Sequence, residues 1–200
     1  MMEIAVLVIA YFIGNVSPAY ILVKFAANID IREHGSGNAG TTNVVRVMGT
    51  KAGILVLVSD LLKGVLAVWI GRYFGGDLLA VLAGLFVVIG HNWPVLLKFK
   101  GGKGVATSLG VGLIISPQTA LICIGIAIIV ILTTKYVSLA SLTGIPIWTV
   151  LLIVRGGNHL YVYLGIALSV LAIIKHRSNI RRIYSGTENK FDLKNKLNRS

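Results

Sequence analysis

Residues 53–73 read GILVLVSDLLKGVLAVWIGRY, and residues 78–97 read LLAVLAGLFVVIGHNWPVLL. Each run is about twenty residues long and consists mostly of aliphatic side chains. A bilayer core is about 30 Å thick and an α-helix rises about 1.5 Å per residue, so a run of this length matches one crossing. These two runs therefore predict membrane-spanning helices.

Three further runs have the same character, namely Ile4 to Leu22, Val137 to Val154 and Leu160 to Lys175. A longer run, Val105 to Thr134, is interrupted by Ser116-Pro117-Gln118. Because proline cannot continue a helix, we expect two short spans joined by a tight turn at this point. The predicted fold class is all-α, a polytopic membrane protein with about seven transmembrane helices.

The composition excludes an ordinary soluble domain. Of the 200 residues, 56% are hydrophobic and 13% are charged, whereas about a quarter of the residues in a typical soluble domain are charged. Since the polar connectors are short, we expect a single domain over residues 1–200, with a basic tail from about residue 176 to residue 200. The first run has no basic segment before it and no small-residue cleavage site, which indicates a span rather than a signal peptide.

The net charge of +12 comes from 19 Lys and Arg against 7 Asp and Glu. Such an excess is typical of nucleic-acid-binding proteins or of membrane proteins with a cytoplasmic face, and the apolar composition favours the second. We therefore expect no nucleic-acid partner. Basic residues gather in alternate connectors and in the C-terminal tail, which predicts an N-terminus outside and a C-terminus in the cytoplasm.

Polar residues inside the predicted spans lie in the half of each helix nearer the cytoplasm, as Asn15, His91 and Thr107 do. Polar groups in hydrocarbon are costly unless they face one another or water, so this distribution indicates a pocket open to the cytoplasm. Asp60 and Lys63 stand three residues apart on one helix face. We interpret them as a structural ion pair rather than as a catalytic pair.

The first connector is rich in hydrogen-bond donors. It reads HGSGNAGTTNVVR from His34 to Arg46, with three glycines in six residues. Glycines let backbone N–H groups approach an anion, and the arginine fork matches phosphate. A flexible polar loop would have a similar composition, but the density of donors favours an anion-binding nest. The candidate residues are Ser36, Gly37, Asn38, Thr41, Asn43 and Arg46.

A second donor-rich segment, KFKGGKGVAT, extends from Lys98 to Thr107. Glycines just before a helix place free N–H groups and a positive helix end where a phosphate can bind. The Walker A spacing is absent, so nucleotide hydrolysis is not supported. We expect Lys98 and Lys100 to contact lipid headgroups. The candidate phosphate-binding residues are Gly101, Gly102, Lys103, Gly104 and Thr107.

The third segment, KHRSNIRR, begins at Lys175 and follows the last predicted span. His176 and Asn179 share one face of a helix, so both can point toward the same site. A basic segment here is by default an anchor on the cytoplasmic side, but that interpretation leaves the histidine and asparagine pair unexplained.

Together, these segments resemble the PlsY family, bacterial integral-membrane glycerol-3-phosphate acyltransferases that use acyl phosphate as donor. The likeness rests on SGNAGTTNVVR at residues 36–46, on GHNWP followed by KGGKGVAT within residues 90–107, and on HRSNI and GTENK near the end. It implies lysophosphatidic acid as product, a location in the bacterial cytoplasmic (inner) membrane with the active site facing the cytoplasm, and a soluble upstream enzyme that supplies acyl phosphate. We expect a monomer.

The resemblance also implies the roles of individual residues. It assigns Ser36 and Arg46 to an essential hydroxyl and cation, and the loop around Lys103 to phosphate binding. The residues that it implies near the C-terminal part of the site are Ser141 and Thr143 as polar contacts, His176 and Asn179 as a functional pair, and Glu188 as a residue of structural character.

The expected chemistry is electrostatic. None of the four histidines has an aspartate five positions later, so the usual His-Asp base of related acyltransferases is missing. We hypothesise that Arg46, Lys103 and His176 bind the two substrate phosphates, while Ser36, Asn179 and backbone N–H groups stabilise the oxyanion. No metal-ligand spacing is present, and we expect no cofactor.

Two other classes of function remain open at this point. A transporter of small organic phosphates would need polar residues near the bilayer midplane and on both sides, often in repeated halves, and the sequence has neither. A lipid-binding scaffold without activity would not need so many phosphate-type motifs.

Overall fold

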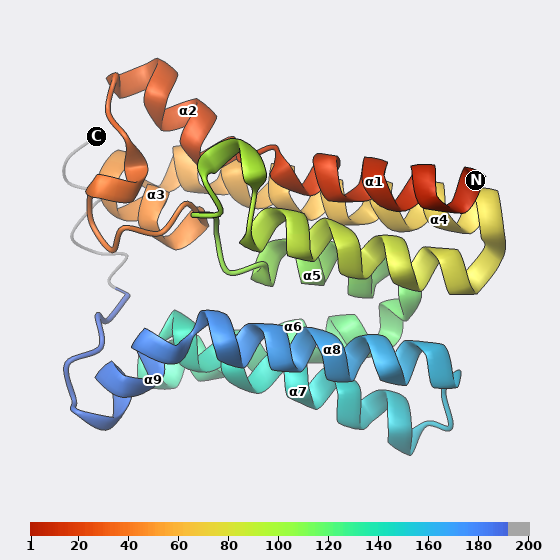
Figure 1. Ribbon diagram of the computed structural model, residues 1–200. Coiled ribbons are helices and arrows are strands. Elements are labelled where there is room, and N and C mark those ends of the chain that lie inside the picture. Colours follow the sequence, from red (N-terminus) through yellow and green to blue (C-terminus); the bar gives the residue numbers. More distant parts are fainter. Residues whose placement is uncertain (192–200) are drawn as a thin grey trace. The chain divides into compact units, whose positions relative to one another are not determined.

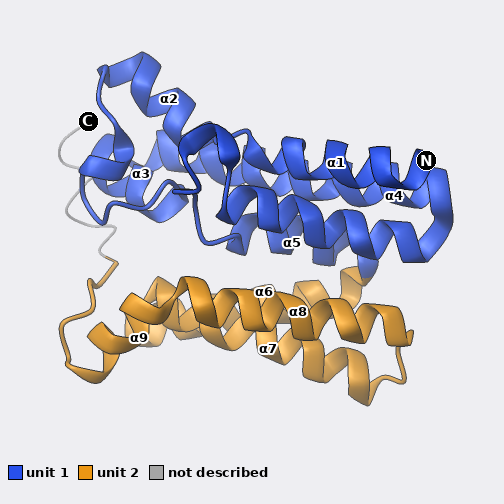
Figure 2. Cartoon of the chain, viewed as in Figure 1, with its two compact units in different colours: residues 1–115 blue, residues 116–200 orange. Residues whose placement is uncertain are grey.

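The computed structural model describes residues 1–191, and every regular element within that range is a helix. The helices form two compact units (Figures 1 and 2), an N-terminal unit of Met1–Ile115 and a C-terminal unit that begins at Ser116. Of the predicted basic tail, residues 192–200 lie outside the described part of the chain. The single-domain organisation stays a prediction.

The N-terminal unit contains five α-helices and two short 3₁₀ helices. In chain order these are α1 (Met2–Asn15), α2 (Pro18–Ala27), η1 (Ile31–Glu33), α3 (Thr41–Met48), α4 (Thr50–Asn92), η2 (Val95–Leu97) and α5 (Val105–Ile115). The predicted first span is thus interrupted between α1 and α2. Proline occupies the first turn of α2, where its missing N–H costs nothing, and the Ser17 hydroxyl caps that turn by accepting from the Tyr20 N–H at 3.3 Å.

Helix α4 is a hairpin of two arms. Its backbone leaves the helical conformation at Gly75 and Gly76, and φ of Gly76 is +64°, a value that glycine adopts without strain. A β-carbon on Gly84 would lie 3.1 Å from the Val68 side chain, so the two arms lie side by side. They correspond to the apolar runs of residues 53–73 and 78–97.

The second arm ends earlier than the predicted span, at Asn92 instead of Leu97. Pro94 explains the difference, because its ring and missing N–H prevent the helix from continuing. Residues Val95–Leu97 form η2 instead, and this short turn leads into the glycine-rich segment.

Helices α1 and α5 pack closely against α4 because glycines lie at the contacts. A β-carbon on Gly90 would overlap the Tyr11 carbonyl oxygen of α1, and one on Gly110 would overlap the Leu61 carbonyl oxygen. Small residues let helix backbones approach closely, which is how helices in a membrane associate without a hydrophobic driving force.

Up to residue 191, the C-terminal unit contains four helices, which are α6 (Pro117–Thr134), α7 (Val137–Val154), α8 (His159–Lys175) and α9 (Arg177–Tyr184). Helix α7 packs against both α6 and α8. The break at Pro117 and the bounds of α7 agree with the prediction, and α9 bends away from α8 by 62°. Helix α9 buries Asn179 and exposes Arg177 and Arg181.

Within the described residues, four stretches are long and apolar enough to cross a membrane, or five if α8 and α9 form one bent span. The α4 hairpin divides the longest of these stretches into two arms. Helix α5, expected as a span, has only 11 residues, which corresponds to about 17 Å, against a bilayer core of about 30 Å. The count of seven spans and their sidedness stay predictions.

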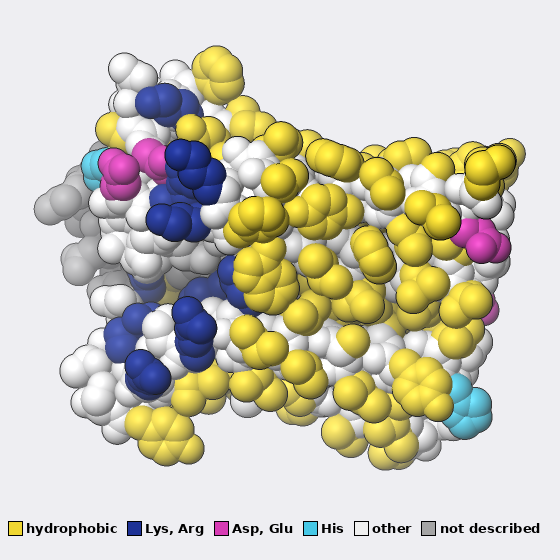
Figure 3. Space-filling model, viewed as in Figure 1, with side chains coloured by type: hydrophobic (Ala, Val, Ile, Leu, Met, Phe, Trp, Pro, Cys, Tyr) yellow, Lys and Arg dark blue, Asp and Glu magenta, His cyan; other side chains and the backbone are white. Residues whose placement is uncertain are grey.

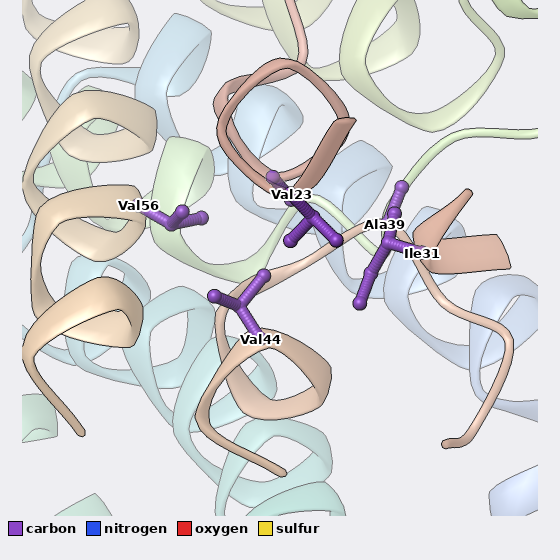
Figure 4. Packing of buried hydrophobic residues seen from close by; sticks show 6 residues of the cluster. Val23, Ile31, Ala39, Val44 and Val56 are labelled. Atoms are coloured by element: carbon purple, nitrogen blue, oxygen red, sulfur yellow. The ribbon is translucent and has the colours of Figure 1, made fainter. Parts of the chain in front are cut away.

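A hydrophobic cluster fixes the first connector to the helices around it (Figure 4). It consists of Ala19 and Val23 of α2, Ile31 of η1, Ala39, Val44 of α3 and Val56 of α4. Full burial of one Val or Ile side chain contributes about 1.5–3 kcal/mol. Because Ala39 belongs to this cluster, the donor-rich connector has a fixed place in the N-terminal unit.

Candidate active site

Asn43 organises the first donor-rich loop. Its side chain is 1% exposed, and its Nδ2 donates to the carbonyls of Ile31 (3.1 Å) and His34 (2.9 Å). Its Oδ1 accepts from the Ser36 N–H at 2.7 Å. These three bonds use most of the capacity of the amide, so the geometry favours a positioning role over the predicted substrate contact.

Ser36 lies between two glycines with left-handed backbone. The φ angles of Gly35 and Gly37 are +62° and +71°, and a β-carbon on Gly35 would overlap Asn43 Oδ1. Only glycine meets both conditions at position 35. The turn presents Ser36 at an exposed position, as a residue that contacts substrate requires.

Helix α3 starts directly after this loop at Thr41. Its first-turn N–H groups carry the partial positive charge of a helix start. The Thr41 hydroxyl is buried and has no hydrogen-bond partner among the described residues. A buried polar group without a partner is costly, so this hydroxyl is a candidate to bind a ligand. Arg46, in the last turn, is half-buried and is held by at least one other residue.

The glycine-rich segment, residues 101–104, presses against the end of α4. The Gly102 N–H donates to the His91 carbonyl at 3.1 Å. A β-carbon on Gly101 would overlap the same carbonyl, and one on Gly102 would overlap His91 Nε2. Gly104 has φ of +76°. Because side chains are excluded at these positions, the backbone packs closely at the start of α5, with Gly102 and Gly104 buried and Lys103 half-buried between them.

The two donor-rich loops meet within the N-terminal unit. A β-carbon on Gly102 would lie 3.0 Å from the carbonyl oxygen of Ala39 in the first loop. The turns that precede the two loops are also joined, since Arg32 Nη1 of η1 donates to the Leu97 carbonyl of η2 at 2.9 Å. Two segments about sixty residues apart in the chain thus form one donor-rich surface.

Arg32 and Asp30 are part of this junction and were not among the predicted residues. Arg32 Nη2 lies 2.6 Å from Asp30 Oδ2, and its Nε lies 3.0 Å from Asp30 Oδ1. Hydrogen bonding from Arg32 holds the pKa of Asp30 below its ordinary value. A signal was present in the sequence, because Asp is a preferred residue at a helix start, where Asp30 Oδ1 accepts from the Arg32 N–H at 2.9 Å.

The predicted ion pair on α4 is present and includes a third partner. Lys63 Nζ lies 2.8 Å from Asp60 Oδ1 and 2.7 Å from His91 Nδ1 on the other arm of the hairpin. Spacing on one helix revealed the pair, but not the histidine 28 residues later.

Thr107, a predicted substrate contact, lies in the first turn of α5 and is 0% exposed. Its carbonyl oxygen lies where a β-carbon on Gly64 would overlap it, so this turn packs tightly against α4. The Thr107 hydroxyl has no hydrogen-bond partner among the described residues. Contact with substrate stays a prediction for this residue.

The C-terminal unit contains a network centred on the Glu188 carboxylate. Glu188 accepts from Ser138 Oγ at 2.9 Å, Asn179 Nδ2 at 2.7 Å and Arg182 Nε at 2.7 Å. Burial acts to raise the pKa of Glu188, but these three hydrogen bonds outweigh burial and lower it. The network holds Asn179 in place, which agrees with the structural character expected of Glu188.

His176 lies at the junction of α8 and α9 and is 2% exposed. Its Nδ1 donates to the Ala172 carbonyl at 2.8 Å, which leaves Nε2 for other contacts. His176 and Asn179 are both buried, but the helix expected to carry both is broken at His176, which lies between α8 and α9. The hydroxyls of Ser141 and Thr143 donate to carbonyls of their own helix, at 2.9 Å and 3.0 Å.

The predicted residues thus fall into two groups. The first and second motifs meet at Ala39 and Gly102 in the N-terminal unit, and His176, Asn179 and Glu188 belong to the C-terminal unit, where Glu188 holds Asn179. In each unit, Lys and Arg side chains gather at one end, and apolar side chains predominate over the rest of the visible face (Figure 3). Within residues 1–191 no group of three or more His, Cys, Asp or Glu residues is placed to hold a metal ion.

Comparison with known proteins agrees with these features. The family model for glycerol-3-phosphate acyltransferase matches residues 4–186. The glycerol-3-phosphate acyltransferase of Alkaliphilus metalliredigens is 49% identical over 97% of this chain and 98% of its own length. That of Thermoanaerobacter sp. is 50% identical over 95% of this chain and 96% of its own.

Two crystal structures of PlsY, an integral membrane glycerol 3-phosphate acyltransferase, have the same fold. The glycerol 3-phosphate form matches with a TM-score of 0.94 and 36% identity, over 98% of this chain and 99% of that one. The lysophosphatidic acid form matches with a TM-score of 0.90 and 35% identity, with the same coverage. The family model and the relatives each extend over nearly the whole chain, and the chain therefore belongs to the glycerol-3-phosphate acyltransferase family of integral membrane enzymes.

Proposed function

We propose that this enzyme transfers a fatty acyl group from acyl phosphate to the 1-hydroxyl of glycerol 3-phosphate and releases lysophosphatidic acid and phosphate. The observation that carries the proposal is the meeting of the two donor-rich loops, where a β-carbon on Gly102 would lie 3.0 Å from the Ala39 carbonyl oxygen. Neither loop segment, residues 34–46 or 98–107, contains an acidic residue. A reaction between two phosphorylated substrates needs such a surface.

The choice of acyl phosphate as donor follows from the missing His-Asp base. An acyl phosphate is a mixed anhydride with a good leaving group, so the enzyme mainly has to hold two anions in reacting geometry. The glycerol oxygen attacks the acyl carbonyl carbon, the bond from that carbon to the phosphate oxygen breaks, and phosphate departs with the electron pair. A substrate phosphate oxygen takes the hydroxyl proton, which removes the need for a His-Asp base.

The proposed roles of the residues follow the motifs. Arg46, Lys103 and His176 bind the phosphates, and Ser36 and Asn179 with backbone N–H groups stabilise the developing oxyanion. The buried Thr41 hydroxyl and the positive start of α3 support an anion next to Ser36. The further substrate contacts that we propose are Gly37, Asn38, Thr107, Ser141, Thr143 and the glycines of residues 101–104.

We further propose that the chain crosses the bacterial cytoplasmic membrane about seven times, with the C-terminus and the active site at the cytoplasmic face. The gathering of basic side chains at one end of each unit supports this (Figure 3). The acyl donor then comes from a soluble cytoplasmic enzyme, and the lipid product stays in the bilayer. The protein acts as a monomer.

A donor comparison tests the activity. The purified protein in lipid nanodiscs is given labelled glycerol 3-phosphate with hexadecanoyl phosphate, hexadecanoyl-CoA or hexadecanoyl acyl carrier protein, each in a separate reaction. We expect labelled lysophosphatidic acid from the acyl phosphate alone. Equal use of the thioesters would overturn the donor assignment.

The cation roles are tested with two lysines of one segment. We expect Lys103→Ala to lower kcat/KM by about 100-fold, because a phosphate contact made in the transition state is lost, while Lys98→Ala stays near the wild type. An acyl group trapped on Ser36 during turnover would exclude direct transfer between the substrates.

A further inference from the structure

Three ionisable side chains lie together beneath the glycine-rich segment. Asp60 and Lys63 come from the first arm of α4, and His91 comes from the second. Their exposed fractions are 2%, 7% and 5%. Lys63 Nζ lies 2.8 Å from Asp60 Oδ1 and 2.7 Å from His91 Nδ1, and His91 Nδ1 lies 3.4 Å from Asp60 Oδ1.

The hydrogen bonds around Lys63 determine which nitrogen of His91 carries the proton. An ammonium group has three donors and no acceptor. Lys63 Nζ, paired with Asp60 Oδ1, therefore donates to His91 Nδ1, and the Val16 and Gly14 carbonyls, at 3.0 Å and 3.3 Å, share its remaining donor. Because Nδ1 is the acceptor, the neutral His91 ring carries its proton on Nε2.

This Nε2 faces the glycine-rich segment. A β-carbon on Gly102 would overlap it, so the imidazole lies directly against the backbone there. The His91 carbonyl accepts from the Gly102 N–H at 3.1 Å. His91 thus contacts the loop through both its ring and its main chain, and Lys63 fixes the ring.

Stability alone does not account for three ionisable groups at this place. A buried ion pair costs so much desolvation that apolar residues of similar volume often serve the fold equally well. The position of the cluster against the segment that binds phosphate gives it a different use, because a site for a small anion depends on donors held in place by a second layer of contacts.

We propose that Asp60, Lys63 and His91 form a positioning network that sets the tautomer and orientation of His91 and thereby holds the Gly101–Gly104 backbone in its phosphate-binding conformation. Asp60 fixes Lys63, Lys63 donates to His91, and His91 supports the loop. The proposal rests on the proposed function in one respect, namely that this loop binds a substrate phosphate. The three residues act through the loop and do not react themselves.

Kinetics of a charge-neutral double variant test the network. Asp60→Asn combined with Lys63→Met removes both charges together, so that no unpaired charge remains buried. We expect KM for a phosphorylated substrate to rise by about tenfold or more while the protein stays folded, because a displacement of about 1 Å is enough for a loss of that size. Wild-type kcat and KM in this folded variant would overturn the proposal.

A matched control exists on the same hairpin. Arg72 and Asp77 form an ion pair of 3.3 Å near its turn, with side chains 39% and 45% exposed. Arg72→Met combined with Asp77→Asn removes the same two charges there, and we expect kcat and KM to remain at wild-type values. An equal rise of KM in this control would show that the hairpin responds to any lost ion pair, and the proposal would fail.

The ring of His91 can be observed in the wild-type protein, with one variant used only to assign its signals. In protein labelled with ¹⁵N-histidine, the His91 signals are those missing from the spectrum of His91→Gln. We expect an unprotonated Nδ1 and a protonated Nε2, and we expect the Nε2 signal to shift when glycerol 3-phosphate is added. A protonated Nδ1, or an Nε2 signal that glycerol 3-phosphate leaves unchanged, would contradict the proposal.

The experiments distinguish a failure of the proposed acyl transfer from a failure of the positioning network. If the wild-type protein makes no lysophosphatidic acid from acyl phosphate, the proposed function is wrong whatever the spectrum shows. If the wild type is active but the spectrum contradicts the tautomer, only the positioning network is wrong.

Discussion

The two units bear their candidate residues on different kinds of scaffold. In the N-terminal unit, the loops owe their shape to missing side chains, since β-carbons at Gly35 and Gly102 would overlap Asn43 and His91. In the C-terminal unit, one carboxylate holds Ser138, Asn179 and Arg182. A site built from backbone should fail when an atom is added, whereas a network built on one charge should fail when the charge is removed.

The largest expected effect comes from adding one carbon atom to the second loop. In Gly102→Ala the methyl group meets the His91 ring, which Lys63 holds and which therefore cannot yield, and it also meets the Ala39 carbonyl. We expect kcat/KM for acyl transfer to fall by about 100-fold or more, because the loop has to move. Steady-state kinetics in nanodiscs measure this.

Gly125→Ala is the matched control for this change. Gly125 lies within α6, and a β-carbon there would meet nothing within 4 Å. We expect this variant to keep its activity and to unfold at the same or a higher temperature, because alanine favours helix. Near-normal activity of Gly102→Ala would show that the loop is not built by exclusion of side chains.

The next effect concerns the amide that closes the first loop. Asn43→Asp keeps an acceptor for the Ser36 N–H but removes the donors to the Ile31 and His34 carbonyls. A buried carbonyl left without its donor costs about 1–3 kcal/mol. We expect kcat/KM to fall by about tenfold to a hundredfold.

Asn28→Gly is the control for the Asn43 change. Asn28 is exposed, and its φ of +54° suits glycine. We expect unchanged kinetics. If Asn43→Asp instead lowered kcat/KM no more than Asn28→Gly did, Asn43 would not hold Ser36 in place.

The helices show how much of the fold can be predicted from the sequence alone. The apolar runs predict nearly all the long helices, because hydrophobic length is a local property. Hydrophobic length does not reveal a helix end that depends on one residue. Pro94 stops α4 at Asn92, five residues before the predicted end at Leu97. The run that forms α5 is predicted as a short helix before Ser116, but with 11 residues it is shorter than the span expected there.

The sequence predicts the motifs as segments, but it does not predict the separate role of each residue within them. Glycines beside a lysine predict an anion site from composition. Asn43 looks like one more polar ligand in that pattern, and only the three-dimensional structure shows its amide bonded to three backbone groups of its own loop. His91 was assigned to a polar cluster, but its pairing with Lys63 depends on the α4 hairpin.

A smaller effect is expected in the C-terminal unit, and on stability more than on KM. Glu188→Gln keeps the shape of the side chain but removes the charge that three donors share. We expect about 1.5 kcal/mol lower stability, because hydrogen bonds to a charged group are stronger than neutral ones. Thermal unfolding in detergent micelles, compared with the wild type, measures the difference.

The pH dependence of this difference has a defined sign. The pKa of Glu188 is lower in the folded state than its ordinary value of 4.5, so its contribution is present above about pH 4.5 and is lost as the pH falls through the folded-state pKa. The wild type and Glu188→Gln should therefore become more alike in stability below about pH 4. A constant difference down to low pH would indicate that the charge of Glu188 is not what stabilises the unit.

The smallest effect should come from the one cation of that network. The Arg182 side chain is 35% exposed, whereas that of Glu188 is 4% exposed, and exposed ion pairs contribute about 0–1 kcal/mol. Arg182→Gln leaves the bonds from Ser138 and Asn179 in place. We expect a loss below about 1 kcal/mol that shrinks further as salt is added, since salt screens exposed charges. If Arg182→Gln were as destabilising as Glu188→Gln at every salt concentration, the network would depend on the ion pair, and the neutral donors that hold Asn179 would contribute little.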